Sequence, residues 1–240
     1  MTSISVLIPA LNEESTIEQV IETHIDVLNR CTKLNYISDY EIIILNDGSS
    51  DSTLEQIAKF QCSKKIIVLS NKYSSGLQKA FSTLYNSASK TWTYLTPGDA
   101  QIPSINLEKF IIEAHMLNWK VAIFGRRKKF QHYGLLRLII SFVFTKYSNF
   151  IVSQKIPDIG TVKLVPSILN KQEYMCKSVL QEIERVKYLK LFEYPIKIVD
   201  ITWVARERGK SHGISFNTLI SVIREIKFLK RKFDTKNLRQ

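Results

Sequence analysis

The regular alternation of short apolar runs with helical patterns constrains the fold of this chain more than any other feature. Five runs rich in β-branched and aromatic residues are expected to form strands, at residues 4–9, 41–45, 65–69, 91–95 and 121–124. Four segments with helical spacing separate them, at residues 14–34, 51–60, 77–89 and 105–117, the first of them opened by Asn12. The strands are continuously apolar, as strands covered on both faces are. The pattern therefore predicts an α/β fold with a mostly parallel central sheet and helices on both faces.

The regular alternation of predicted strands and helices ends after Gly125. A basic loop leads into an amphipathic stretch at 133–153, and residues 158–165 are expected to be extended. A helix around 178–189 and a strand at 196–204 follow. The last predicted element is a basic amphipathic helix at 214–233. With 240 residues and 45% hydrophobic content, the chain is long enough for one packed domain with an appendage.

Positive charge is concentrated in two segments. The net charge is +12, from 34 Lys and Arg against 22 Asp and Glu. Segment 126–155 holds seven basic residues and no acidic one, and segment 214–240 holds seven basic residues against two acidic ones. These basic residues alternate with aliphatic side chains and not with stacking aromatic ones, and no nucleic-acid recognition motif is present, which favours an anionic membrane surface as partner over nucleic acid. Three alternatives stay open: 135–152 as a core helix that covers the sheet, 214–233 as a helix packed on the domain with its basic side chains solvated, and contact between copies of the chain through either segment.

Neither a membrane span nor a disulfide framework is expected. The longest apolar stretch, 135–152, is interrupted by Arg137, Lys146 and Asn149, whereas a spanning helix needs roughly 20 mostly apolar residues. The N-terminus has no basic region of the kind that precedes a signal sequence. Three widely spaced cysteines indicate a reducing compartment. We therefore expect a cytoplasmic protein that associates peripherally with the membrane.

Polar motifs follow three of the predicted strands. They are PALNEE at 9–14, NDGSSDST at 46–53 and TPGDAQ at 96–101. Each could be ordinary turn and cap chemistry. The carboxyl ends of parallel strands meet at one edge of a sheet, where α/β proteins bind ligands, so together the motifs predict one site. No Gly-x-Gly-x-x-Gly or P-loop is present, which argues against a dinucleotide-binding or P-loop protein.

With IPALNEE and ILNDGSSDST, the chain resembles the inverting glycosyltransferases of family 2, which have the GT-A fold. The closest branch is that of the dolichyl- and polyprenyl-phosphate sugar transferases, and the resemblance covers about residues 3–212. It implies that the base and ribose of a UDP- or GDP-linked sugar are held by residues of the first two motifs: Pro9, Leu11, Glu13, Asn46 and Asp47. Asn46 stands where the family usually has Asp.

The resemblance also implies a domain organisation and a metal. Residues 1–212 would form the catalytic domain, with a nucleotide-sugar half at 1–103, an acceptor half at 104–212 and a basic tail at 213–240. The family's Asp-x-Asp aligns with 97–99, where Pro97 replaces the first Asp and Asp99 takes the metal-binding position. Gly98 and Gln101 complete the motif, and Asp99 with Gln101 would bind Mg²⁺ or Mn²⁺ together with the donor's diphosphate.

Further residues carry the implied chemistry. Arg127 and Arg206 would hold phosphate oxygens, since guanidinium groups bind phosphate bidentately, and Ser211 belongs to the Arg-x-x-Gly-x-Ser motif that starts at Arg206. A hydroxyl acceptor needs a general base, for which Asp158 is the first candidate and Glu182 or Glu184 the next. The remaining polar candidates are three histidines: His115, expected to be structural, and His132 and His212, which flank basic loops.

The implied function is metal-dependent sugar transfer from a nucleotide-diphospho-sugar to a polyprenyl phosphate at the membrane surface. Two alternatives stay open. One is transfer to a sugar hydroxyl of a polysaccharide or glycolipid, and the other is a non-catalytic nucleotide-sugar-binding protein, which the loss of the first Asp at Pro97 suggests.

Overall fold

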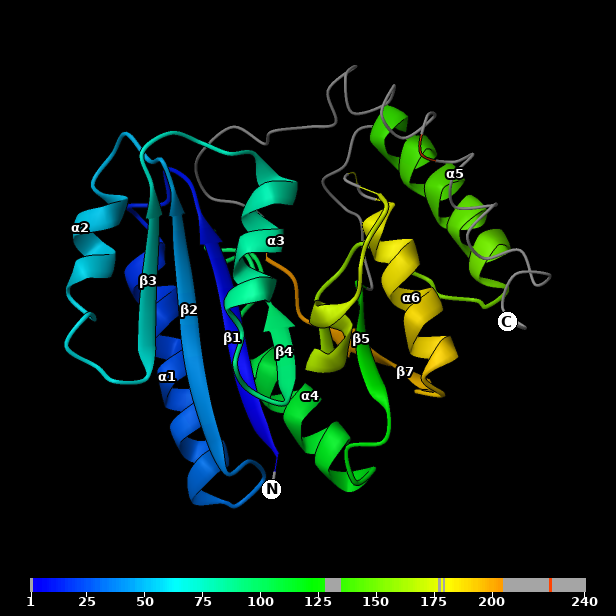
Figure 1. The fold of residues 1–240 in the computed structure, drawn as a ribbon, viewed down its shortest axis with the longest axis horizontal. Coiled ribbons are helices and arrows are strands. Elements are labelled where there is room, and N and C mark those ends of the chain that lie inside the picture. The colour runs from blue at the N-terminus through cyan, green and yellow to red at the C-terminus, as the bar shows by residue number, and fades with distance from the viewer. Residues whose placement is uncertain (1, 128–134, 177, 179, 205–224, 226–240) are drawn as a thin grey trace.

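A computed structural model describes residues 2–127, 135–176, 178, 180–204 and 225 of the chain (Figure 1). Its strands are β1 (Ser3–Ala10), β2 (Asp39–Asp47), β3 (Ile66–Asn71), β4 (Trp92–Leu95), β5 (Ala122–Arg127), β6 (Lys163–Pro166) and β7 (Ile196–Ile201). Its helices are α1 (Ile17–Lys33), α2 (Thr53–Ala58), α3 (Leu77–Ser87), α4 (Ile105–Met116), α5 (Leu135–Val152) and α6 (Gln181–Leu191), with a short 3₁₀ helix η1 (Ser167–Lys171) after β6.

The strands of the described residues form one sheet in the order β3-β2-β1-β4-β6-β5-β7. β6 runs antiparallel to its neighbours β4 and β5, and the other pairs are parallel. The prediction of a mostly parallel sheet is therefore confirmed. We call the edge at which the parallel strands end the carboxyl edge. Because β6 is reversed, its first residue, Lys163, lies at this same edge.

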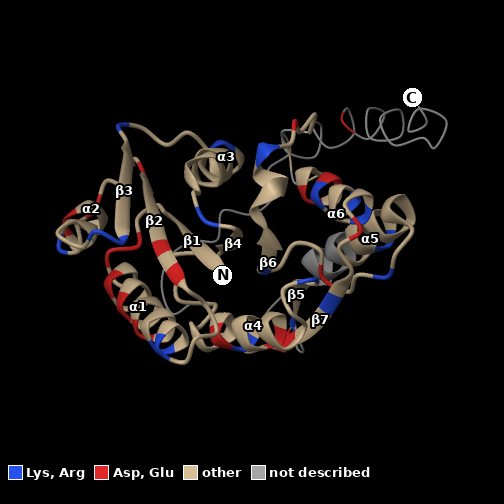
Figure 2. Cartoon of the chain, turned by 60° about the horizontal axis from the view of Figure 1, so that its bottom comes forward, with Lys and Arg blue, Asp and Glu red and all other residues tan. Residues whose placement is uncertain are grey.

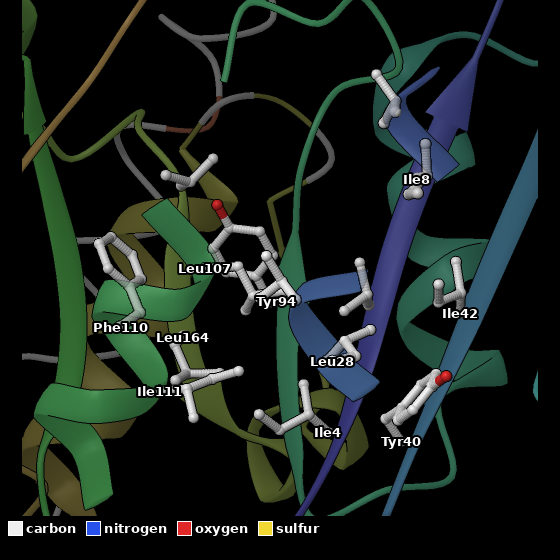
Figure 3. Close-up of a cluster of buried hydrophobic side chains, with 14 of the residues drawn as sticks. Ile4, Ile8, Leu28, Tyr40, Ile42, Tyr94, Leu107, Phe110, Ile111 and Leu164 are labelled. Carbon is white, nitrogen blue, oxygen red and sulfur yellow. The ribbon is translucent and has the colours of Figure 1, made fainter. Parts of the chain in front are cut away.

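Helices cover both faces of the sheet, as predicted. Side chains of alternate β1 residues, such as Ile4 and Ile8, pack with α1 and α4 in one buried cluster (Figure 3). Between them on the strand, Leu7 packs with Leu84 of α3 in a second cluster on the opposite face. A third cluster joins β5, α5 and α6. Since both faces of the central strands are buried, their sequences are continuously apolar rather than alternating.

Several predicted boundaries are wrong: the strand predicted at 196–204 ends at Ile201, and two further differences change the loops at the carboxyl edge. The first helix begins at Ile17 and not at residue 14, and Asn12 does not open it. Asn12 has a left-handed backbone with φ 57°, and its side-chain Oδ1 accepts a hydrogen bond from the Ser50 backbone N–H at 2.8 Å. The segment 158–165 is extended only from Lys163, because the Thr161 N–H bonds back to the Asp158 carbonyl in a turn.

The structure describes residues 126–127 and 135–155 of the first basic segment, and only residue 225 of the second. No helix of the described residues is long and apolar enough to cross a membrane. The predicted helix 214–233 lies outside the described residues except for Glu225, whose carboxylate accepts hydrogen bonds from the backbone N–H and side-chain hydroxyl of Ser178.

Replacing Phe110 with Ala tests the central core. Phe110 of α4 is fully buried and meets the ring of Tyr94 edge-on, with ring centroids 5.8 Å apart (Figure 3). Truncating a buried Phe costs about 3 to 5 kcal/mol of stability. Denaturant unfolding should show this loss for Phe110→Ala and a change of less than about 0.5 kcal/mol for Phe150→Ala, since Phe150 is 75% exposed. Equal losses in the two variants would contradict this packing.

Candidate active site

The loops that follow β1 and β4 touch each other directly at the carboxyl edge. The Gly98 N–H donates to the Pro9 carbonyl at 3.3 Å, and the Thr16 hydroxyl donates to the Gly98 carbonyl at 2.9 Å. A Cβ atom on Gly98 would lie 3.1 Å from both the Pro9 oxygen and Ile17, so the approach leaves little room for a side chain. The prediction that the first and third motifs lie close together is therefore confirmed.

The first and second motifs are joined in the same way. The backbone N–H of Glu13 donates to the Thr53 hydroxyl at 2.8 Å, and that of Glu14 donates to the Asp51 carboxylate at 3.2 Å. In return, the Glu14 carboxylate accepts the Ser52 N–H at 3.0 Å. The Thr53 and Asp51 side chains thus bond the adjoining loop as well as each other. Ser52, which precedes α2, makes no side-chain cap hydrogen bond, but the Asp51 carboxylate accepts the backbone N–H of Thr53, the first residue of α2, at 3.0 Å. Asp51 therefore contributes to the start of α2 and also joins the two loops.

Asp47 anchors a loop that the sequence motifs do not include. Its carboxylate accepts hydrogen bonds from the last residue of β3 and from the loop that follows it, and Asp47 is 5% exposed. The donors are Asn71 Nδ2 at 2.7 Å, Ser74 Oγ at 2.9 Å, Ser75 Oγ at 2.7 Å and the backbone N–H groups of Ser75 and Gly76 at 2.9 and 3.2 Å. Burial alone would raise the pKa of Asp47, but the hydrogen bonds from Ser75, Asn71 and Ser74 together outweigh it, so the pKa lies below its ordinary value. Asp47 holds the β3–α3 loop at the carboxyl edge.

Gly48 lets that loop pass close by. Its φ is +77°, and a Cβ atom would lie 2.5 Å from the Tyr73 carbonyl carbon and 2.6 Å from the Ser74 nitrogen. A residue with a side chain at this position would therefore be strained and would displace the loop. Neighbouring Asn46 is 3% exposed and bonds Ser70 of β3 through Nδ2 at 3.0 Å, while Leu11 on the opposite loop is half-buried.

Asp99 lies in the turn after β4, one residue beyond Gly98. One of its carboxylate oxygens accepts the Gln101 N–H at 3.1 Å, and the Gln101 amide nitrogen donates to the Val204 carbonyl at 3.4 Å. Val204 precedes Arg206 by two residues, so the chain approaches this turn just before the predicted Arg-x-x-Gly-x-Ser motif. That motif, with Arg206 and Ser211, lies outside the described residues, as do His132 and His212.

The residues of this turn fit a cation whose coordination is completed by the substrate. Within the described residues, no three His, Cys, Asp or Glu side chains group around one point. Mg²⁺ is commonly held by one or two carboxylates together with substrate phosphates and water. One carboxylate, from Asp99, with the amide oxygen of Gln101 therefore suits a cation that arrives with a diphosphate, and not a closed structural metal site.

Arg127 and Asp158 form one ion pair. Nε and Nη2 of Arg127 donate to the two carboxylate oxygens of Asp158 at 2.7 and 2.9 Å. Their side chains are 20% and 9% exposed. The structure thus brings together two residues predicted for separate roles, at the end of β5 on the carboxyl edge. The preceding Arg126 pairs with Asp200 of β7 at 2.6 Å.

The two further base candidates are held by other groups. Lys163 Nζ donates to the Glu182 carboxylate at 2.6 Å, and Arg185 Nε lies 3.5 Å from its other oxygen. Glu184, which is fully buried, accepts the backbone N–H groups of Met175 and Cys176 at 3.2 and 2.8 Å. Glu184 therefore stabilises the chain before α6. His115 packs against the ring of Tyr36, which agrees with its expected structural role.

Sequence reasoning missed Lys163 and the loop of Asn71, Ser74, Ser75 and Gly76. For the loop the signal was available, since a polar run follows the third predicted strand as polar runs follow the first, second and fourth. For Lys163 the signal was absent, because its place at the carboxyl edge depends on β6 being antiparallel.

The pH dependence of stability tests the role of Asp47. Because its folded-state pKa is lowered, the carboxylate contributes stability above pH about 4 and loses it as the pH falls through the folded-state value. Asp47→Asn should therefore lower the free energy of unfolding by about 1 to 3 kcal/mol at pH 7. The difference from wild type should shrink as the pH falls to 3.

Denaturant unfolding at several pH values measures this difference, and Asp26→Asn, at an exposed position on α1, is the control. A gap between wild type and Asp47→Asn that stays constant down to pH 3 would contradict the anchoring role of the carboxylate.

Comparison with known proteins agrees with this geometry. The family described as glycosyl transferase family 2 matches residues 5–172. An undecaprenyl-phosphate 4-deoxy-4-formamido-L-arabinose transferase of Proteus mirabilis (strain HI4320) is 28% identical over 117 residues, 48% of this chain and 34% of the relative. A dolichyl-phosphate beta-glucosyltransferase of Dictyostelium discoideum is 36% identical over 76 residues, 30% of this chain and 23% of the relative. The chain thus spans only about a third or less of these relatives.

Solved structures show the same fold. Glucosyl-3-phosphoglycerate synthase of Mycobacterium tuberculosis, in complex with Mg²⁺ and uridine diphosphate, has a TM-score of 0.64 at 16% identity, over 96% of this chain and 79% of that one. The same enzyme with Mn²⁺, UDP-glucose and phosphoglyceric acid gives the same values. This likeness confirms the predicted GT-A fold. Since the family match extends over more than half of the sequence, the chain belongs to the family 2 glycosyltransferases.

Proposed function

We propose that this chain moves a sugar, with inversion and with a divalent cation, from a nucleotide-diphospho-sugar to a polyprenyl-phosphate-type lipid at a membrane surface. Residues 1–103 bind the donor, residues 104–212 the acceptor, and residues 213–240 form a basic tail. Family membership supports this proposal, as do the two relatives described above, an undecaprenyl-phosphate and a dolichyl-phosphate sugar transferase.

The donor binds at the carboxyl edge, between the loops after β1, β2 and β4. Pro9, Leu11 and Glu13 line one side, and Asp47 acts from the other through the β3–α3 loop that it anchors. The solved structures of similar fold hold uridine diphosphate with Mg²⁺ or Mn²⁺, which favours a uridine donor.

Charge on the departing diphosphate is the main obstacle to transfer. When bound, Mg²⁺ or Mn²⁺ would neutralise developing charge on the leaving oxygen. Asp99 and Gln101 would hold the cation from the turn after β4. Arg127 and Arg206 would add guanidinium donors to phosphate oxygens, which they bind through two N–H groups at a time.

The hydrogen-bond partners of the three candidate bases favour one class of acceptor. A hydroxyl acceptor must lose a proton to a base, whereas a lipid phosphate is already an anion. Asp158 is paired with Arg127, Glu182 with Lys163, and Glu184 with two backbone N–H groups. All three base candidates are thus already bound to hydrogen-bond donors. For Glu182, burial alone would raise the pKa, but the charges of Lys163 and Arg185 outweigh it and lower the pKa, which makes this carboxylate a weaker base. This favours an acceptor that needs no deprotonation.

The exposed face of α5 favours a lipid surface. Phe142, Val143 and Phe150 are 59% to 75% exposed, and Lys146 and Lys155 flank them around a groove of about 730 Å³. α5 carries no acidic residue, while acidic side chains gather along α1 at the far side of the molecule (Figure 2). Basic residues beside an apolar helix face attract an anionic interface. This surface gives peripheral association on the cytoplasmic side.

A donor screen tests the catalytic turn. Nucleotide-sugars at about 100 times their dissociation constant should stabilise the folded chain by about 2.7 kcal/mol, and Mn²⁺ should strengthen this effect. Asp99→Asn should remove the Mn²⁺-dependent part and lower turnover about 100-fold or more. Asp39→Asn, at the opposite edge of the sheet, should change neither. Equal turnover in both variants would exclude the assigned role of Asp99, and donor binding without turnover in wild type would favour the non-catalytic alternative.

Vesicle flotation tests the surface on α5. Phe142→Ser with Phe150→Ser should reduce binding to vesicles of anionic phospholipid by about 10-fold or more, since each large apolar side chain contributes about 1.5 to 3 kcal/mol when buried. The matched control is Met116→Ser with Leu191→Ser, which removes apolar side chains that are exposed elsewhere. If both double variants float as wild type does, α5 is not the membrane-facing surface.

A further inference from the structure

Lys163 occupies an unusual place for a lysine. It is the first residue of β6 and pairs with Phe124 of β5, while the next residue, Leu164, pairs with Tyr94 of β4. Lys163 therefore lies level with the end of β4, which continues into the Asp99 turn. Its side chain is 9% exposed, and a buried lysine requires partners for its charge.

The ammonium group of Lys163 is bound to Glu182. Nζ donates to Glu182 Oε2 at 2.6 Å and to the Thr161 carbonyl at 3.0 Å, and it lies 5.4 Å from the centre of the Phe124 ring. Glu182 stands in the first turn of α6, with its side chain 16% exposed. The pair thus joins the carboxyl edge of the sheet to the start of a helix in the acceptor half.

A second cation holds the other side of Glu182. Arg185 lies one turn further along α6, with Nε 3.5 Å from Glu182 Oε1. Its guanidinium is packed between the rings of Tyr85 and Tyr174, at 3.6 and 4.6 Å from their centres. Arg185 is 2% exposed, and this packing fixes it in place. The groups that face Glu182 are therefore two cations and two neutral phenols.

These contacts determine the protonation of Glu182. Burial alone would raise its pKa, but the charges of Lys163 and Arg185 and the hydrogen bond from Lys163 outweigh burial and lower it. Without Lys163 most of that compensation is lost while burial remains, so the pKa would rise. A carboxylate with a raised pKa is a better general base near neutral pH.

We propose that Lys163 determines the acceptor class of this enzyme by neutralising Glu182, a carboxylate of the acceptor half that would otherwise be available to deprotonate a hydroxyl acceptor. This inference rests on the proposed function and adds a specificity-determining residue to it. Lys163 acts through Glu182, so it is a positioning residue and not a catalytic one. With the pair intact, only an acceptor that is already anionic reacts at a useful rate.

The reaction that Lys163 suppresses is transfer to a neutral O–H group. In that reaction the acceptor oxygen bonds to the anomeric carbon, and its proton passes to the Glu182 carboxylate. The bond between the anomeric carbon and the diphosphate oxygen breaks, and the nucleoside diphosphate leaves with the electron pair. Water is the simplest such acceptor, and its reaction hydrolyses the donor.

Replacing Lys163 with Met tests this role. Hydrolysis of the nucleotide-sugar in the absence of lipid should rise about 10-fold or more, since a positioned base contributes about 10² to 10⁴-fold. The rate should rise with pH through a single ionisation that wild type does not show. Lys163→Gln is the second variant, because it retains a hydrogen-bond donor if Met prevents folding. Lys163→Arg should restore the wild-type rate and pH profile.

The matched control is the double variant Lys163→Met with Glu182→Gln. It should show neither the additional hydrolysis of Lys163→Met nor the ionisation in its pH profile. A gain that survives in this double variant, or no gain in folded Lys163→Met and Lys163→Gln, overturns the inference. Assay of the wild type with polyprenyl phosphate separates this failure from that of the proposed function. Wild-type transfer to the lipid without any gain in the variants rejects only the role of Lys163. Wild-type transfer only to hydroxyl groups, abolished by Glu182→Gln, rejects both.

Discussion

The parallel pairing of β1 with both β2 and β4 is the constraint on which the rest of the structure depends. It ends three strands at one edge, and the loops that follow them are then close enough to bond one another. The bonds from Gly98 to Pro9 and from Glu13 to Thr53 are consequences of that register. The loops that carry the carboxylates are therefore held to one another by hydrogen bonds of their backbone groups.

Charge pairing is the second organising feature. Ionisable groups that are separated in the sequence are joined in the folded chain, as Arg127 is to Asp158 and Glu182 is to Lys163. Such pairs are costly to bury unless each charge is compensated. Arg127 and Lys163 both lie at the carboxyl edge, where we propose that the phosphate-bearing substrates bind.

The sequence allowed prediction of the sheet and its covering helices because strands buried on both faces carry an unmistakable apolar pattern. It did not allow prediction of the reversed direction of β6, since four residues of strand have no pattern that indicates direction. The start of α1 was misplaced because Asn12 has cap chemistry but uses it to bond Ser50 in another loop. Asp47 was found through its motif, but its partners lie 24 to 29 residues later and are brought to it only by the pairing of β2 with β3.

Crystallography with manganese and a nucleoside diphosphate tests the central claim most directly, because the metal can be located by its anomalous scattering. The account predicts one manganese peak bound to Asp99 and to both phosphates, with the nucleoside lying along the loops after β1 and β2. A diphosphate bound elsewhere on the molecule, or a manganese ion that does not contact Asp99, would contradict it.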